Sequence, residues 1–125
     1  MASNQVSVKV LPEYIPEESN PSKKRYVFAY TVIIENLGQA PAQLMSRHWI
    51  ITNGETLKTQ EVQGDGVVGQ QPRIEPGEHF EYTSGTVLES PVGTMQGSYK
   101  MVDDDGEFFE VNIPVFTLAA THSVH

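Results

Sequence analysis

Apolar side chains recur at every second position in several short stretches of this chain, and prolines, glycines and asparagines separate these stretches. In residues 4–11, Val6, Val8 and Val10 alternate with polar residues, and in residues 25–35 both alternating sets are rich in apolar side chains. A period of two puts successive side chains on opposite faces of a β-strand, whereas an amphipathic helix repeats every 3.6 residues. The pattern therefore predicts strands, and the two-sided apolarity of 25–35 predicts a central one.

Turn-forming residues predict where the strands begin and end. Pro12 is expected to end the first strand, Asn53-Gly54 to form a type I′ hairpin turn, and Ser84-Gly85 to form a bulge. Residues 12–21 contain three prolines and three acidic residues, so they predict an irregular loop. Further strands are expected at 44–52, 56–62, 78–83, 85–88, 94–102 and 107–118, with Asp and Gly at 103–106 supplying a tight connection before the last one.

Short strands with turn signals between them, and no convincing helix, predict an all-β fold. We expect an immunoglobulin-like or fibronectin-III-like β-sandwich of about seven antiparallel strands, with a closed barrel as the alternative. Residues 1–125 are expected to form one domain, with 118–125 as a frayed tail.

Composition limits the chemistry that the chain can perform. It has no cysteine, which excludes thiolate metal sites, a cysteine nucleophile and disulfides. Its net charge of −8 argues against binding a nucleic-acid backbone, which draws on clustered Lys and Arg. The N-terminus does not resemble a signal peptide, and no apolar run reaches the roughly 18 residues of a membrane span. We therefore expect a cytoplasmic protein that binds neither nucleic acid nor membrane.

Residues 64–69 read Gly-Asp-Gly-Val-Val-Gly, the G-x-G-x-x-G spacing of dinucleotide-binding loops. In those enzymes the loop opens a helix whose N-terminus meets the pyrophosphate. Here Pro72, Pro76 and Gly77 follow, and an interior proline costs a helix about 3 kcal/mol. The sequence predicts a tight loop between strands or, alternatively, a backbone nest for phosphate. The candidate pyrophosphate-binding residues are Gly64, Asp65, Gly66 and Gly69.

Another group of candidate residues lies in the stretch Ser46-Arg47-His48-Trp49. On a strand, Arg47 and Trp49 share one face, and His48 lies on the other. Trp49 is the sole tryptophan and is expected in the core. Arg47 and His48 are interpreted as structural residues or, alternatively, as part of an interaction surface with Arg73 that receives an anion or a peptide carboxylate.

Other constellations point only weakly to a site. No two histidines have the i, i+4 spacing of a zinc protease, and no metal site is predicted. Asp103, Asp104 and Asp105 are interpreted as a solvated acidic turn, with divalent-cation binding as an alternative. No nucleophile and base stand in a recognisable catalytic pattern, so we expect no enzymatic activity and no cofactor.

Taken together, several stretches make the chain similar to the bacterial ApaG family, also called CorD. The resemblance runs in order along nearly the whole chain. The stretches that carry it are RYVFAY at 25–30, SRHWIIT at 46–52, GDGVVGQQP at 64–72, FEYTSG at 80–85, GSYKM at 97–101 and FEVNIPVF at 109–116.

The resemblance implies a fibronectin-III-like sandwich without established enzymatic activity. It also implies a link to cobalt resistance and magnesium efflux, and similar domains in eukaryotic F-box proteins are taken as protein-interaction modules. The family carries a proposed pyrophosphate or nucleotide role for the glycine loop. We therefore expect a non-enzymatic binding module for an unknown protein partner or, alternatively, a small-ligand protein that binds pyrophosphate or a dinucleoside polyphosphate at 64–69.

Overall fold

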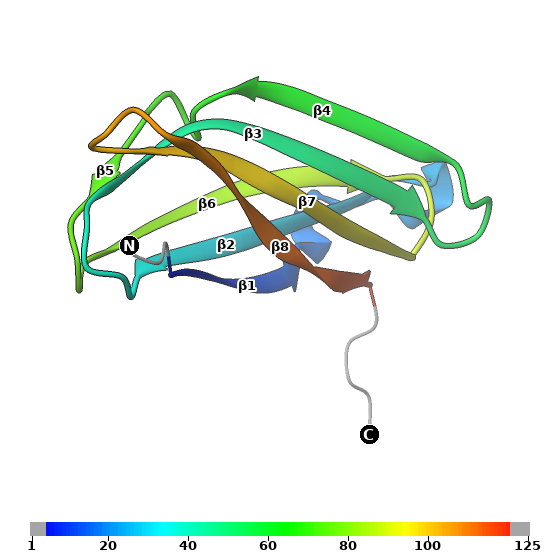
Figure 1. Ribbon diagram of the computed structural model, residues 1–125. Coiled ribbons are helices and arrows are strands. Elements are labelled where there is room, and N and C mark those ends of the chain that lie inside the picture. Colours follow the sequence, from blue (N-terminus) through cyan, green and yellow to red (C-terminus); the bar gives the residue numbers. More distant parts are fainter. Residues whose placement is uncertain (1–4, 121–125) are drawn as a thin grey trace.

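The computed structural model describes residues 5–120, and two antiparallel sheets make up almost all of it (Figure 1). One sheet has the strand order β1-β2-β6, and the other has the order β4-β3-β7-β8, with the short β5 paired to β3. The elements are β1 (Val6–Tyr14), η1 (Pro16–Glu18), η2 (Pro21–Lys23), β2 (Tyr26–Asn36), β3 (Ala42–Asn53), β4 (Thr59–Asp65), β5 (Arg73–Ile74), β6 (His79–Leu88), β7 (Val92–Asp103) and β8 (Phe108–Ala119). The chain crosses between the sheets after β2, β5 and β6, as in a Greek-key sandwich. The predicted all-β sandwich is confirmed.

The core lies between the sheets and follows the predicted alternation. On β2, Phe28, Tyr30, Val32 and Ile34 face inward and are buried, and β2 is the central strand of its sheet, as predicted. Trp49 is also buried, as expected, and its ring meets the rings of core aromatics of both sheets. These aromatic edge-to-face contacts join the sheets at the middle of the sandwich.

Several predicted boundaries are wrong. β1 continues through Pro12 to Tyr14, because β1 is an edge strand and an edge position tolerates a residue without an N–H donor. The pairing of β2 with β6 runs without a register shift, so there is no bulge at Ser84-Gly85. The shifts lie instead between Leu44 and Ser46 and between Met95 and Gly97.

The ends of the chain and the irregular segment also differ from expectation. The last strand extends to Ala119, and Leu118 is fully buried, so the predicted tail does not begin at residue 118. The remainder of that tail, 121–125, lies outside the described residues, as do 1–4. The loop predicted at 12–21 contributes the end of β1 and two short 3-10 turns, each of which begins at a proline.

The predicted type I′ turn at Asn53-Gly54 is wrong. Asn53 accepts hydrogen bonds at its side-chain oxygen from the amides of Glu55 and Thr56, and five residues connect β3 to β4. Gly54 has no positive φ; its amide instead donates to the Val92 carbonyl, which a Cβ at Gly54 would approach to 2.8 Å. The side chain of Asn53 thus closes a longer, Asx-type turn.

Candidate functional site

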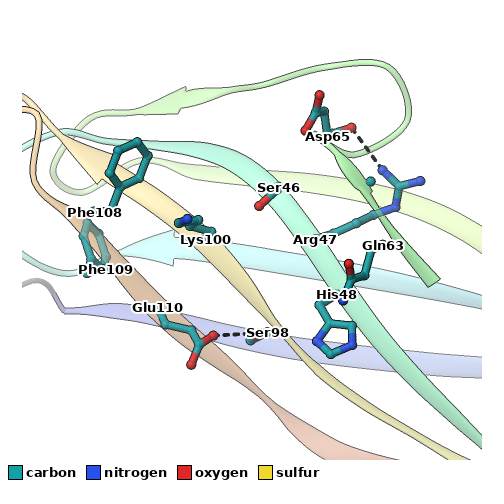
Figure 2. Close-up of a pocket in the computed structure, with 11 residues that line it drawn as sticks. Ser46, Arg47, His48, Gln63, Asp65, Ser98, Lys100, Phe108, Phe109 and Glu110 are labelled. Atoms are coloured by element: carbon teal, nitrogen blue, oxygen red, sulfur yellow. Dashed lines mark hydrogen bonds between the residues drawn. The ribbon is translucent and has the colours of Figure 1, made fainter. Parts of the chain in front are cut away.

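Strand β3 separates two neighbouring candidate residues onto opposite faces of its sheet. Arg47 shares the inner face with Trp49, and His48 lies on the outer face with Ser46. Figure 2 shows the Arg47 side chain extending toward Asp65 and the His48 side chain leaving the strand in another direction. The side chains of Arg47 and His48 therefore extend to opposite sides of the sheet.

The outer face of the β4-β3-β7-β8 sheet is hollowed into a wide basin of about 700 Å³, which we call the outer basin. Two cross-strand rows of side chains build it: Gln63, His48 and Ser98 in one, and Asp65, Ser46 and Lys100 in the other. The small Ser46 lies in the middle of the second row and the small Ser98 ends the first, next to longer side chains, which accounts for the hollow. The residues that line it are Ser46, Arg47, His48, Gln63, Gly64, Asp65, Ser98, Lys100, Phe108, Phe109 and Glu110.

The side chains of the outer basin make few and long polar contacts with one another. His48 Nε2 lies 3.3 Å from a carboxylate oxygen of Glu61, and the Ser98 hydroxyl donates to Glu110 over 3.3 Å. The Lys100 ammonium lies 5.1 Å from the ring centre of Phe108, whose side chain is 59% exposed. The basin therefore presents both charges and an accessible aromatic ring to solvent.

Glu61, His48 and Ser98 have the residue types of a hydrolytic triad and follow one another across β4, β3 and β7. The geometry differs from a triad in two ways. Ser98 donates to Glu110 rather than to His48, and the amides beneath the basin belong to paired strands, where they face neighbouring carbonyls rather than a substrate oxyanion. These side chains therefore lack the serine–histidine hydrogen bond of a hydrolytic triad.

On the inner face, the Arg47 guanidinium lies against the backbone of Gly64. Its Nη1 donates to the carbonyls of Asp65 and Gly66, over 3.0 and 2.8 Å. A Cβ at Gly64 would come within 2.9 Å of both terminal nitrogens of Arg47. Gly64 faces Arg47 directly in the β3–β4 pairing and is itself a strand residue, as is Asp65. The expectation that 64–69 is entirely a loop between strands is therefore wrong for these two residues.

The other two glycines of the motif, Gly66 and Gly69, are favoured at their positions by the conformation of the backbone. Gly66 has φ +65°, and a Cβ there would lie 2.3 Å from the Gln70 carbonyl oxygen. Val67 and Gln70 exchange two backbone hydrogen bonds around Val68 and Gly69, whose φ values are +42° and +80°. Positive φ at both central residues is the mark of a type I′ turn. We call residues 64–70 the glycine hairpin; its Val67 side chain is buried in the core.

Several amides of the glycine hairpin already donate to protein carbonyls. The amide of Gly66 donates to Met45, and those of Val67 and Gln70 donate to each other's carbonyls. An anion-binding nest needs successive amides that point at the ligand. A phosphate nest formed by Gly64, Asp65, Gly66 and Gly69 stays a prediction that this arrangement does not favour.

Arg73 and the acidic turn form a separate ion pair. Arg73 donates to both carboxylate oxygens of Asp104, over 2.5 and 3.0 Å, and to Glu75 over 2.9 Å. This hydrogen-bonded guanidinium holds the pKa of Asp104 below its usual range. Arg73 does not line the outer basin, so it is not brought together with His48. Among residues 5–120, no group of three or more His, Asp or Glu side chains could hold a metal ion.

Tyrosine hydroxyls beside Arg47 were missed by the sequence analysis. Tyr82 and Tyr99, from opposite sheets, share a short hydrogen bond in the core. Burial raises the pKa of Tyr82 to about 12 and raises that of Tyr99 further. Tyr30 is also buried, and its raised pKa is partly offset by a hydrogen bond with Ser84 and by the charge of Arg47. The signal in the sequence was the period-two alternation that places these tyrosines on the inward faces of their own strands.

Comparisons with known proteins agree on one family. A sequence profile of the ApaG domain matches residues 16–103. Proteins named ApaG from Salmonella arizonae and Salmonella paratyphi B are 56% identical over 123 residues, which is 98% of each chain. The crystal structure of the ApaA protein from Bordetella pertussis superposes with a TM-score of 0.92 at 56% identity, covering 96% of this chain and 97% of that one. A structural-genomics X-ray structure gives a TM-score of 0.87 at 48% identity, covering 96% and 92%.

Proposed function

Because the chain belongs to the ApaG domain family, we propose that it is a non-enzymatic binding domain whose outer basin receives a protein partner. The observation that supports this proposal most directly is the basin itself, an open hollow on a sheet face rather than an enclosed cleft. Its exposed Phe108 supplies an aromatic anchor, and Lys100, Asp65 and Glu110 supply charges around it. An accessible aromatic surrounded by polar groups is the usual composition of a transient protein interface.

The chemistry of the basin also supports a binding role over a catalytic one. The serine, histidine and carboxylates are present, but the Ser98 hydroxyl has only a 3.3 Å hydrogen bond to the exposed Glu110 and none to His48. Side chains that contact one another so loosely can exchange these contacts for those of a partner at small cost. We expect the partner to present a mixed surface, with both charges and an apolar residue for Phe108.

A capture experiment with matched serine variants tests this proposal. Ser98→Arg fills the middle of the basin with a long side chain, whereas Ser7→Arg places the same side chain on the exposed face of β1 in the other sheet. We expect the tagged wild-type protein and Ser7→Arg to retain the same protein from an extract of their own cells, and Ser98→Arg to lose it. Retention of identical proteins by all three would contradict a role for the basin.

We also propose that the link to cobalt resistance and magnesium efflux, which the family resemblance implies, results from partner binding. If it passes through the basin, cells whose chromosomal copy carries Ser98→Arg should show the cobalt sensitivity of cells without the gene. Cells with Ser7→Arg should grow like the wild type. Wild-type growth with Ser98→Arg would separate the cation link from the basin.

A further inference from the structure

A second, smaller cavity of about 310 Å³ lies between the glycine hairpin and the β1-β2-β6 sheet. We call it the inner cavity. Its walls include Arg47 from one sheet and Tyr30 and Ser84 from the other, and Val68 and Gly69 belong to its hairpin side. The inner cavity is thus built from side chains of both sheets, and it opens on the side of β3 opposite His48.

Arg47 forms no ion pair within residues 5–120. The ion pairs of the described chain join His48 to Glu61 and Arg73 to Glu75 and Asp104. The two hydrogen bonds of Arg47 both leave from Nη1 and end on backbone carbonyls. Its Nε and Nη2 therefore remain as a fork of donors without a carboxylate, and such a fork matches two oxygens of one anion.

Hydroxyl groups complete the polar lining beside this fork. Tyr30 and Ser84 are cross-strand partners in the β2–β6 pairing, and both line the inner cavity. A hydroxyl group can donate one hydrogen bond, so this pair can offer a donor to an acceptor in the cavity. A cation from one sheet and a hydroxyl donor from the other, lining the same cavity, favour an oxyanion over a neutral or cationic ligand.

We propose that the inner cavity binds a small oxyanion, held by the Nε–Nη2 fork of Arg47 and by the Tyr30–Ser84 hydroxyl pair. The ligand chemistry is an anion with at least two oxygens in one plane, which a phosphate or a carboxylate group provides. This site does not use the amides of the glycine hairpin. It goes beyond the proposed partner binding, because it lies on the other side of the sheet and takes a small ligand.

Two features of the hairpin bear on how the oxyanion would be held. Val68 is a β-branched residue at φ +42° and is 54% exposed, so the hairpin keeps an unfavourable conformation beside the cavity. Asp65 also borders the cavity, and although its side chain lies in the outer row with Ser46, its nearby negative charge opposes an anion. The charge of Asp65 should therefore limit affinity, and its removal should increase it.

Nuclear magnetic resonance titration of the full chain tests the proposal. The probes are inorganic phosphate and acetate, with chloride as the reference anion, at a constant ionic strength of about 0.15 M. We expect phosphate, acetate or both to shift the Arg47 Nε–H signal and the Val68 and Gly69 amides with saturation. The more effective anion identifies the ligand group. If neither shifts these signals saturably up to tens of millimolar, the proposal is overturned.

Matched variants distinguish this site from general attraction to positive charge. Arg47→Lys keeps the charge but removes the fork, and we expect about tenfold weaker binding. Tyr30→Phe and Ser84→Ala, which leave Arg47 in place, should each weaken binding about threefold, and Asp65→Asn should strengthen it about threefold. Arg25→Met removes an exposed arginine elsewhere and should change nothing. Unchanged binding in Arg47→Lys and in Tyr30→Phe would overturn the proposal.

Discussion

The two faces of β3 carry neighbouring residues that are held in different ways. On the inner side, Arg47 is fixed by two carbonyls and by the bare backbone of Gly64, and buried tyrosines lie beside it. On the outer side, His48 has a single long contact with an exposed glutamate. The glycine hairpin and the Nη1 end of Arg47 resist change because several contacts hold them, whereas the outer basin keeps its groups available for a partner.

This difference assigns the glycine motif to structure rather than to chemistry. Each of its three glycines is required by the local structure. A Cβ at Gly64 would collide with the Arg47 guanidinium, one at Gly66 would collide with a carbonyl oxygen, and Gly69 adopts the positive φ of a tight turn. Because these glycines are needed for packing and backbone conformation, the motif is best tested by the free energy of unfolding of its variants. The outer basin is best tested by binding, since its residues contribute little to packing.

The largest loss of stability is expected for Gly66→Ala. The new Cβ would meet the Gln70 carbonyl at 2.3 Å with φ at +65°, so the hairpin must rearrange. We expect the free energy of unfolding to fall by about 2–4 kcal/mol in urea denaturation. Gly69→Ala is the matched control: it has a similar φ of +80° but no atom within 4 Å, and should cost only about 1 kcal/mol. Equal losses in the two variants would show that the positive φ, and not the close approach to the Gln70 carbonyl, causes the loss of stability.

Alkaline conditions should weaken the inner region next. The pKa of Tyr82 is raised to about 12 by burial in the folded protein, against 10.0 for the ordinary side chain. The folded state therefore holds this proton more tightly, so its contribution is complete below pH 10 and is lost as the pH rises toward 12. We expect a loss of about 2 kcal/mol over this window in unfolding experiments at constant salt. Tyr82→Phe should reduce the slope of the pH dependence and leave the part contributed by Tyr99 and Tyr30, whose pKa values are also raised; an unchanged slope would contradict this assignment.

A smaller effect is expected where Gly64 meets Arg47. In Gly64→Val, the Cβ would displace the guanidinium from its carbonyls, at a cost of about 1–2 kcal/mol. Because the obstacle is the flexible end of a side chain, the cost should mostly disappear in a background of Arg47→Met. A double-mutant cycle in urea should give a coupling of about 1 kcal/mol. Additive effects would show that the glycine is required for some other reason.

One substitution in the same hairpin should stabilise the fold. Val68→Asn places a residue that tolerates positive φ at the first central position of the type I′ turn, where Val68 has φ +42°. We expect a gain of about 0.5–1 kcal/mol, seen as a higher melting temperature. A loss instead would mean that the Val68 side chain makes a contact that compensates for its backbone strain.

That turn shows why part of the fold was predictable and part was not. The strands followed from period-two alternation, which depends only on local sequence, and the two faces of β3 followed from the same rule. The type I′ turn was predicted at Asn53-Gly54, the favoured residue pair, but it lies at Val68-Gly69. At Asn53-Gly54, the Asn53 side chain instead accepts hydrogen bonds from two amides and closes a different turn. Side-chain and tertiary contacts there override the preference of an Asn-Gly pair for a type I′ turn.

The candidate site was predictable in its residues but not in its geometry. Arg47, His48 and the glycines were recognised from their types and spacing. That Gly64 faces Arg47 depends on the register of β4 against β3, which long-range pairing sets and local sequence does not contain. The inner cavity depends on the approach of Tyr30 and Ser84 from the other sheet, which no local pattern indicates.

The smallest change in stability is expected in the outer basin. His48→Ala removes a side chain that is 35% exposed and has one long contact with a more exposed carboxylate, so little packing is lost. Exposed pairs of this kind contribute about 0–1 kcal/mol, and we expect the free energy of unfolding to stay within about 0.5 kcal/mol of the wild type. If His48→Ala costs as much as Gly64→Val in the same urea titration, the outer face is as tightly built as the inner one. The contrast between the two faces, and with it the argument that the basin is free to serve a partner, would then fail.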